Sequence, residues 1–309
     1  MLDGFLVVDK PSGVTSHHVV AVLRRFFRQK KIGHTGTLDP FATGVLPIAL
    51  GEGTKAITFL DESLKEYRAT MRLGISTDTQ DLEGTVLQER NWRHVTPVMV
   101  TDLLPAFSGE LSQVPPMFSA LKRDGVPLYK LARKGETVER EARGIVIHAL
   151  TIDSIDLPEI SFTVRCSRGT YVRTLSHDMG EYLGCGAHLL QLRRTASGPF
   201  TLENAFTLDE LASLSPDEIT ARHFVTIRKA LSHLPELELT DSGYSRIRNG
   251  MAPEESHLVN PEAFPSAGLV LLCFRGVIAA VGEVLSRDER PDGRLVRISR
   301  GFNQVSPLQ

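Results

Sequence analysis

The sequence has few cysteines, few aromatic residues and almost no net charge. Its 309 residues include three cysteines, 6% aromatic residues and a formal charge of −2. Cys166, Cys185 and Cys273 are far apart and odd in number, so they predict no disulfide framework and favour a reducing, cytoplasmic compartment. The charge balance argues against a protein coated with positive charge for non-specific binding to nucleic acid or membranes.

Motifs for cofactors are also missing. The chain has no HExxH or CxxC pattern and no carboxylate cluster, so a metal site is not predicted. It has neither a GxGxxG nor a P-loop pattern, so no nucleotide cofactor is predicted. The most apolar stretch, near residue 270, is interrupted by Arg275. We therefore expect no metal, no other cofactor and no membrane partner.

The spacing of apolar residues predicts a mixture of strands and helices. Residues 67–73 alternate cleanly between apolar and polar side chains, which is typical of a half-buried strand. The other expected elements are strands at 5–8, 145–152 and 160–166, and helices capped by Ser16, opened by Thr96-Pro97, placed around 128–133 and following Gly169-Thr170. Because strands and helices do not alternate strictly, an α+β main domain is favoured.

The chain after Leu234-Pro235 has a different pattern. A capped helix is expected from Thr240 to Asn249, closed by Gly250. Short apolar strands follow, with a hairpin turn at Arg275-Gly276 and a final strand near residues 295–299. We interpret this part as a small, β-rich second domain.

The segment GHTGTLDPFATGVLP at residues 33–47 is the strongest candidate for chemistry. Most of it lies in residues 30–44, which are rich in glycine, threonine and proline and have no period, so we expect a loop there. Pro40 disfavours helical geometry at Asp39 and keeps its backbone extended. A carboxylate on such a loop suits a nucleophile, a general base or a cation partner. Asp39-Pro40 is also a common turn, and spacing alone favours that interpretation.

Three further residues have both a structural and a functional interpretation. Tyr67 is either a core residue or a ring that stacks on a base. Arg173 is expected in the first turn of a helix, where the helix dipole disfavours a cation, so it is either solvated or paired with a distant carboxylate. His34 is either a turn residue or a wedge for nucleic acid.

Positive charge is concentrated in two parts of the chain. Residues 1–60 and 116–200 each have a net charge of +3, whereas residues 61–115 and 201–309 each have −4. Residues 117–144 contain seven basic and four acidic side chains. Such a run is usually a solvated face, but it also fits a local groove for a polyanion.

Several long motifs resemble the TruB family of tRNA pseudouridine synthases. The segment at residues 234–253, LPELELTDSGYSRIRNGMAP, is similar to the opening of a PUA-like RNA-binding domain. The motifs follow the family's order over nearly the whole chain, although the rest of the second domain matches less well. They are VVDKPSGVTSH at 7–17, GHTGTLDPFATGVLP at 33–47, GEGTKA at 51–56, KEYRATMRLG at 65–74, VPPMFSALKRDGVPLYKLARKG at 114–135 and CSRGTYVRTLSHDMGEYLGCGAHLLQLRRTASGPF at 166–200.

The resemblance implies an α+β fold with two domains. Residues 1–232 would form a pseudouridine-synthase catalytic domain with a mixed, mainly antiparallel sheet flanked by helices, including an RNA-binding insertion at 117–144. Residues 233–309 would form a small PUA-like domain. The implied activity is isomerisation of uridine to pseudouridine at position 55 in the T loop of tRNA. The implied partner is the T-arm stem-loop, and we expect a monomer without a protein partner or cofactor.

The resemblance also assigns roles to residues. Asp39 matches the catalytic aspartate, and Arg173 matches the arginine that keeps it ionised. Tyr67 matches the tyrosine that stacks on the flipped uracil and takes part in proton removal, and His34 matches the residue that fills the vacated space. Tyr171 and Leu192 are expected to line the pocket. Contacts with RNA are expected from Lys10, Lys122, Arg123, Lys130 and Arg133.

Two other functions fit parts of the pattern. An RNA-binding or RNA-remodelling protein without catalysis would bind a T-arm hairpin and leave its uridine unchanged, but it has no need of Asp39, Tyr67 and Arg173 together. A glycoside hydrolase usually needs a second carboxylate as acid, and the sequence shows none near Asp39. Whether Asp39 first attacks the ribose or the base stays open.

Overall fold

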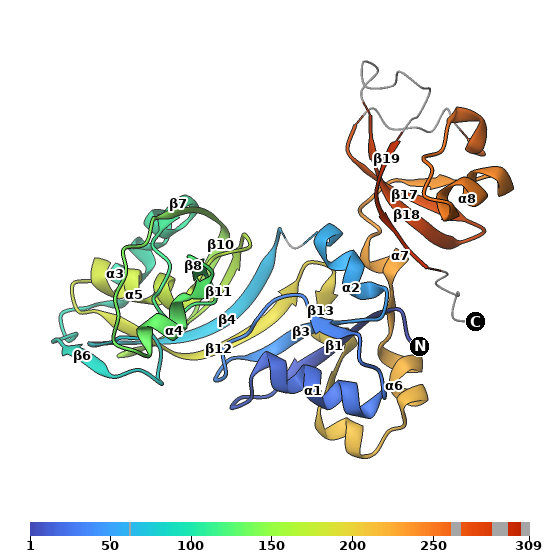
Figure 1. Cartoon of the computed structure of the whole chain (residues 1–309). Helices are drawn as coiled ribbons and strands as arrows, with labels where there is room; N and C mark the ends of the chain where they lie inside the picture. The colour runs from blue at the N-terminus through green and yellow to red at the C-terminus, as the bar shows by residue number, and fades with distance from the viewer. Residues whose placement is uncertain (62, 261–266, 286–295, 304–309) are drawn as a thin grey trace.

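The computed structural model describes residues 1–61, 63–260, 267–285 and 296–303 (Figure 1). Most strands belong to one 11-stranded sheet, and a separate four-stranded sheet lies near the C-terminus. No helix in the described part of the chain is long and apolar enough to cross a membrane.

The main sheet is mixed and mainly antiparallel, as expected. Its β1–β3, β12–β4, β4–β11, β11–β10 and β10–β7 pairs are antiparallel, and its β1–β14 and β3–β12 pairs are parallel. The strands in spatial order are β14 (Ala205–Thr207), β1 (Gly4–Lys10), β3 (Thr43–Leu50), β12 (Ala187–Ser197), β4 (Lys65–Leu73), β11 (Glu159–Cys166), β10 (Arg143–Asp156) and β7 (Gly109–Gln113), with β2 (Ile32–His34), β13 (Phe200–Thr201) and β15 (Val225–Thr226) at its margins.

Short helices and two small hairpins complete the main part of the molecule. The helices are α1 (Ser16–Phe26), α2 (Gly53–Ala56), α3 (Pro97–Asp102), α4 (Leu128–Ala132), α5 (Val172–Tyr182), α6 (Pro216–His223) and α7 (Ile227–Ala230). The hairpins are β5 (Ile75–Thr77) with β6 (Val86–Glu89), and β8 (Lys122–Arg123) with β9 (Val126–Pro127).

One expected helix cap is corrected by the structure. The side chain of Thr15, not Ser16, accepts the N–H of His18 and caps α1. Ser16 is the first helical residue, and its buried hydroxyl bonds the backbone of Leu38 instead. Ser16, expected to cap the helix, therefore holds the loop that carries Asp39 by hydrogen bonds to the backbone of Leu38.

The core of the main sheet follows from strand alternation. The expected apolar face of β4, with Tyr67, Ala69, Met71 and Leu73, is buried, which confirms the period-2 pattern. The expected loop at 30–44 contains the short strand β2, and β3 and β12 were not predicted as strands either. β12 contains Gln191, Arg193 and Arg194 and has irregular register against β4, so its polar residues and bulges hide the alternation.

The second sheet contains β16 (Glu236–Glu238), β17 (Leu269–Phe274), β18 (Val277–Val284) and β19 (Val296–Gly301), beside α8 (Asp241–Arg248). The expected hairpin is confirmed: Arg275 and Gly276 have φ of 50° and 77°, as a two-residue turn of type I′ requires. Of the final strand expected near 295–299, residue 295 lies outside the described residues.

An apolar cluster joins the two sheets. Phe5 of β1 packs in one core with Leu271, Ile278 and Phe302, all buried. Next to this core, the carboxylate of Glu52 accepts the backbone N–H of residue 303 at 3.0 Å. The C-terminal sheet therefore docks on the main sheet through both burial and a hydrogen bond, and its position beside β1 and α2 is visible in Figure 1.

Gly44 is required where β3 meets β12. Its φ is +100°, and a Cβ there would lie 2.1 Å from the carbonyl oxygen of Arg194. We predict that Gly44→Ala lowers the free energy of unfolding by about 3 kcal/mol or more, because backbone strain and a backbone clash add. Urea unfolding of the full chain measures this loss.

Gly13→Ala is the matched control for that substitution. Gly13 also has positive φ, +80°, but no atom lies within 4 Å of its added Cβ. Only the backbone strain of a positive φ remains, so we expect Gly13→Ala to lower the free energy of unfolding by about 1 kcal/mol. Equal losses in the two variants would show that the close approach of β3 and β12 does not constrain Gly44.

Candidate active site

Asp39 lies in the loop between β2 and β3, and the backbone on both sides of it is fastened. Ser16 donates its hydroxyl to the carbonyl of Leu38 at 3.2 Å and accepts the Leu38 N–H at 2.9 Å. On the other side, the ammonium of Lys10 donates to the carbonyl of Pro40 at 3.0 Å. The carboxylate of Asp39 is therefore presented from a fixed backbone.

Lys10 does not occupy the position expected of an RNA contact. The residue is 0% exposed, and its ammonium also donates to the carbonyls of Pro11 and Val14, both at 2.8 Å. Burial lowers its pKa to about 8, although the charge of Asp39 opposes this. The assignment of Lys10 to RNA binding is corrected: in this structure the side chain holds the Asp39 loop together.

Asp39 is paired with Arg173, the second residue of α5. Nε of Arg173 lies 2.9 Å from Oδ2 of Asp39, and Nη2 donates to Oδ1 at 3.3 Å. The side chain of Arg173 is 4% exposed, whereas that of Asp39 is 35% exposed. The pair is therefore shielded on the arginine side and open on the carboxylate side, where a substrate can approach.

A second carboxylate, Asp81, holds Arg173 from another side. Nη1 of Arg173 donates to Oδ2 of Asp81 at 3.2 Å and to the carbonyl of Thr79 at 2.8 Å. Nη2 also donates to the carbonyl of Phe118 at 2.9 Å. These acceptors offset the unfavourable interaction between the Arg173 cation and the dipole of α5 at the helix N-terminus. Arg173 thus connects α5 with three separate segments.

Asp81 is oriented away from solvent. Its side chain is 5% exposed, and its Oδ1 accepts the hydroxyl of Thr79 at 2.6 Å and the N–H of Glu83 at 3.0 Å. Both carboxylate oxygens are therefore engaged within the protein. Asp81 is placed to orient Arg173 rather than to give a proton to a substrate, as the acid of a glycosidase does.

Electrostatics at Asp39 is a balance of burial and charge. Burial raises the pKa of Asp39 above its ordinary value of 3.8, and the charge of Asp81 also raises it. Arg173 lowers this pKa by its charge and its hydrogen bond, and Lys10 adds a smaller lowering. Arg173 is therefore the main group that favours the ionised carboxylate.

Tyr67 shares one face of the main sheet with two residues of β12. Arg194 lies directly opposite Tyr67, and Leu192 lies opposite Ala69, which is two residues further along β4. Tyr67 and Leu192 are each 7% exposed. Burial raises the pKa of the Tyr67 hydroxyl, while Arg194 beside it lowers it and the charge of Asp39 raises it. The hydroxyl is therefore protonated at neutral pH and lies within the electrostatic influence of Asp39.

His34 and Tyr171 lie next to these groups. The ring of His34 meets that of His17 edge to face, with centroids 5.1 Å apart. Burial lowers the pKa of His34, and His17 lowers it further, so the ring is neutral at neutral pH. Tyr171 is the residue before α5, and burial raises the pKa of its hydroxyl, which the charges of Arg173 and Asp39 also influence.

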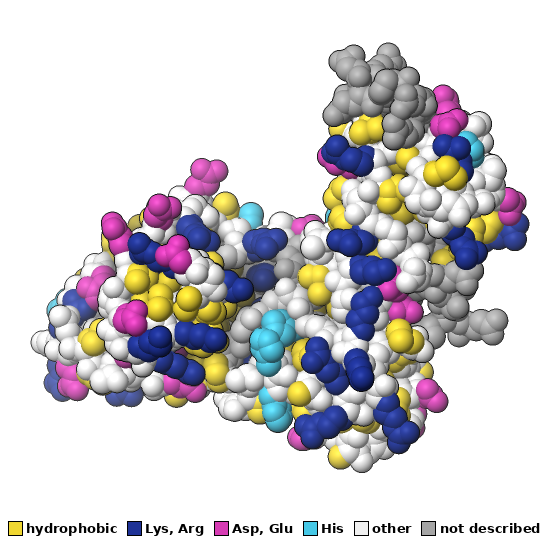
Figure 2. Space-filling model, in the orientation of Figure 1, with side chains coloured by type: hydrophobic (Ala, Val, Ile, Leu, Met, Phe, Trp, Pro, Cys, Tyr) yellow, Lys and Arg dark blue, Asp and Glu magenta, His cyan; other side chains and the backbone are white. Residues whose placement is uncertain are grey.

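The basic residues of the insertion lie at the surface. Lys122 and Arg123 form β8, Lys130 lies in α4 and Arg133 follows α4, and all four are exposed. Arg123 donates to the carbonyl of Glu139 at 2.9 Å. Figure 2 shows Lys and Arg side chains on both sides of a hollow in the molecule, with histidine side chains between them. The four cations of the insertion are thus open to solvent, whereas Arg173 beside Asp39 is buried.

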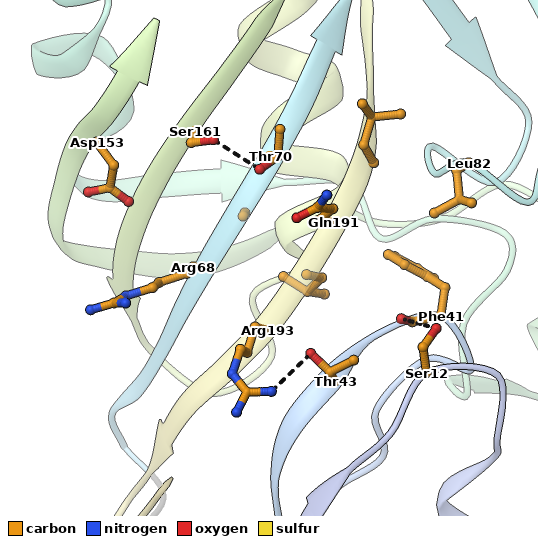
Figure 3. A pocket seen from close by; sticks show the side chains of 13 residues that line it. Ser12, Phe41, Thr43, Arg68, Thr70, Leu82, Asp153, Ser161, Gln191 and Arg193 are labelled. Carbon is orange, nitrogen blue, oxygen red and sulfur yellow. Dashed lines mark hydrogen bonds between the residues drawn. The ribbon is translucent and has the colours of Figure 1, made fainter.

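A cavity of about 520 Å³ lies along β4 and β12 and also reaches Leu192 and Phe41 (Figure 3). Its walls include the side chains of Arg68, Thr70 and Arg193, which alternate along β4 and β12 with Tyr67 and Arg194. Asp39 and Arg173 do not line it. Among the described residues, no group of three or more His, Cys, Asp or Glu is arranged to hold a metal ion.

Two family models match successive parts of the chain. Residues 24–172 match the TruB family pseudouridylate synthase N-terminal domain, and residues 173–232 match the tRNA pseudouridylate synthase B C-terminal domain. The tRNA pseudouridine synthase B of Geobacter sulfurreducens is 55% identical over 98% of this chain and 100% of that protein. This chain belongs to the TruB family. The tRNA pseudouridine synthase B of Geotalea uraniireducens is 53% identical over 98% of each protein.

Solved structures support the same TruB fold. A chain of a Cbf5-Nop10-Gar1 complex is similar with a TM-score of 0.72 and 28% identity, covering 97% of this chain and 85% of that one. A chain of an H/ACA RNP bound to a substrate RNA containing 2′-deoxyuridine has a TM-score of 0.71 and 26% identity, with the same coverage. These likenesses confirm the expected α+β fold with flanking helices and a β-rich C-terminal part.

Sequence reasoning missed two residues of this TruB site, Asp81 and Arg194. Asp81 lies in the turn-rich segment DTQDLEG at 78–84. The sequence pointed to it only indirectly, because an arginine at a helix N-terminus was expected to pair with a carboxylate from elsewhere in the chain. Arg194 lies on a strand that was not predicted, so its alternation with Arg193 gave no signal. Asp39, Arg173 and Tyr67 were singled out from the sequence, and the structure places them in one region.

The charge balance at Asp39 predicts opposite effects for two substitutions. Arg173→Gln removes the main group that lowers the pKa of Asp39, so that pKa should rise. Asp81→Asn removes a charge that raises it, so that pKa should fall. Carbon-13 NMR titration of the Asp39 carboxyl group measures both shifts without an activity assay.

Because an aspartate must be ionised to attack, the acid limb of activity should move with this pKa. It should lie at higher pH in Arg173→Gln than in the unsubstituted chain. An Asp39 titration that is unchanged in both variants would contradict the charge balance described here.

Proposed function

We propose that this TruB-family enzyme isomerises uridine to pseudouridine at position 55 in the T loop of tRNA. The observation that carries the proposal is the Asp39–Arg173 pair: a partly exposed carboxylate is held by a buried arginine, and its charge acts on the hydroxyl of Tyr67. The names of the bacterial relatives support tRNA as the substrate class.

The reaction balances without an oxidant, a reductant or a cofactor. The bond from ribose C1′ to N1 of uracil breaks, the base rotates, and a bond from C1′ to C5 forms. The proton on C5 leaves and N1 gains a proton. Asp39 attacks or stabilises C1′ while the base is detached, as a carboxylate does in retaining glycosidases. Arg173 keeps this carboxylate ionised and aimed.

The target base must leave the T loop to reach Asp39, which costs a few kcal/mol of stacking and pairing. Tyr67 and Leu192, on one face of β4 and β12, provide an apolar wall for the flipped uracil. The hydroxyl of Tyr67 takes part in removal of the C5 proton, and Tyr171 lines the other side. His34, neutral and beside the loop of Asp39, fills the space that the base vacates.

Binding of the T arm involves the insertion and the C-terminal part. We divide the chain at residues 1–232 and 233–309, with the insertion at 117–144 and a PUA-like second domain. The four exposed cations of the insertion contact phosphates, and its Phe118 carbonyl is bonded to Arg173. Closure of the insertion on RNA is thereby linked to the catalytic pair.

We further propose that the enzyme acts as a monomer in the cytoplasm. Asp39, Arg173 and Tyr67 all come from one chain, so a second copy is not needed to complete the site. Its three cysteines are free and buried, which fits a reducing compartment.

Asp39→Asn should separate chemistry from binding. We expect turnover of an unmodified T-arm hairpin, assayed with chelator present, to fall by at least about 10³-fold, because an amide is a poor nucleophile. Affinity for the hairpin should stay within about threefold, since Asp39 contributes no positive charge to phosphate contacts.

Asp9→Asn is the matched control. Asp9 is also a carboxylate paired with an arginine, Arg193, but at the opposite face of the sheet. Its turnover should stay within about twofold, because partly exposed ion pairs contribute little. Substantial residual activity in Asp39→Asn, or an absolute metal requirement in the unsubstituted enzyme, would falsify the proposed chemistry. Hairpin binding without any turnover would favour an RNA-remodelling protein.

Neutralising the insertion should reduce the salt dependence of RNA binding. With Lys122, Arg123, Lys130 and Arg133 all changed to Gln, the slope of log affinity against log salt should become shallower by about 2 to 4, depending on how many reach phosphates. Filter binding over a range of salt concentrations measures the slope.

Four arginines on the opposite face of the sheet give a control of equal charge. Arg68, Arg72, Arg165 and Arg193 alternate along β4, β11 and β12 with the residues of the Tyr67 face. Changing them to Gln should leave the slope nearly unchanged. If the two quadruple variants behave alike, the insertion is only a solvated face.

A further inference from the structure

Arg194 is a buried cation to which the reaction described above gives no task. The residue is 1% exposed, and no acidic group in the described part of the chain lies within ion-pair distance of it. Its Nε donates to the carbonyl of Val45 at 2.7 Å, and Nη2 donates to the carbonyl of Gly36 at 3.3 Å. A guanidinium buried without a counter-ion is costly, so its placement calls for a reason.

The two carbonyls that Arg194 binds lie on either side of Asp39. Gly36 precedes Asp39 in the loop, and Val45 follows it at the start of β3. Gly44 packs directly against the backbone of Arg194, which keeps the loop close to β12. One side chain of β12 therefore spans the loop that presents the reactive carboxylate.

The third neighbour of this guanidinium is the hydroxyl of Tyr67. Tyr67 and Arg194 are directly opposite on β4 and β12, and their side chains interact by charge and by hydrogen bonding. A guanidinium has donors and no acceptor, so Arg194 lowers the pKa of the Tyr67 hydroxyl as a donor to the phenol oxygen would. This contact fixes the position of the Tyr67 hydroxyl at the wall of the site where the flipped uracil would lie.

We propose that Arg194 is a positioning residue that fixes the Tyr67 hydroxyl relative to the Asp39 loop. The inference deepens the proposed function and rests on it, since the spacing of these two groups matters only if both act on one nucleotide. The planar guanidinium of an arginine spreads its donors over a rigid fork whose nitrogens face Gly36, Val45 and Tyr67 separately, whereas a lysine carries all its donors on one nitrogen at the end of a flexible chain. Geometry, not charge alone, is therefore the contribution of Arg194.

A double-substitution cycle tests whether Arg194 acts through Tyr67. The rate of release of tritium from C5 of the target uridine is measured in single turnover for the unsubstituted enzyme, Arg194→Lys, Tyr67→Phe and the double variant. We expect Arg194→Lys to slow the reaction about 30-fold in the presence of the Tyr67 hydroxyl and less than about threefold in its absence. RNA affinity should change less than threefold throughout.

Arg193→Lys is the matched control, because Arg193 is the adjacent residue, points to the opposite face and is paired with Asp9. Its rate should equal that of the unsubstituted enzyme. Equal effects of Arg194→Lys with and without the hydroxyl would overturn the inference while leaving the proposed function intact. Absence of tritium release from the unsubstituted enzyme would instead refute the proposed function.

A second measurement does not depend on the folding of an Arg194 variant. If Arg194 links Tyr67 to the loop, removal of the hydroxyl in Tyr67→Phe should loosen that loop. Hydrogen exchange at the N–H of Ala42, which bonds the carbonyl of Asp39 at 3.1 Å, should then become about tenfold faster. Unchanged exchange at Ala42 would contradict the link.

Discussion

The arrangement of the site depends on the buried guanidinium of Arg173. A buried cation is tolerated only when its donors and its charge are satisfied, and here the acceptors are Asp39, Asp81 and two backbone carbonyls. These acceptors come from separate segments, so each segment must be correctly placed before Arg173 is satisfied. The energetic demand of one side chain thus organises the Asp39 loop, the turn after β5, the start of the insertion and α5.

The two carboxylates of this cluster differ in accessibility, and that difference gives them different tasks. Asp81 is closed off and bonded on both oxygens, whereas the side chain of Asp39 is 35% exposed. Arg173 holds the carboxylate of Asp39 in place. On the sheet side of Asp39, we infer that Arg194 holds the Asp39 loop and the hydroxyl of Tyr67 in place. Two buried arginines, one from α5 and one from β12, therefore hold the groups that we propose to be reactive, Asp39 and Tyr67.

Short-range sequence patterns predicted some parts of the fold and of the site and missed others. The alternation around Tyr67, the loop geometry at Asp39-Pro40 and the helix start near Arg173 were all predictable, because each is a short-range feature. The pairing of Asp39 with Arg173 spans 134 residues, so it came from family resemblance and not from spacing. Asp81 lies in a polar turn without a period, and Lys10 was misassigned because its three carbonyl partners are brought together by the fold.

The proposed role of Arg173 is to aim the carboxylate of Asp39 at the sugar of a flipped uridine. A crystal structure of the enzyme with an unreacted T-arm analogue tests this most directly. In that complex the Asp39–Arg173 pair should persist, and a carboxylate oxygen should lie about 3 to 3.5 Å from C1′ of the target nucleotide, with the base against Tyr67. A target sugar far from Asp39, or an Arg173 that leaves Asp39 to bind RNA, would contradict it.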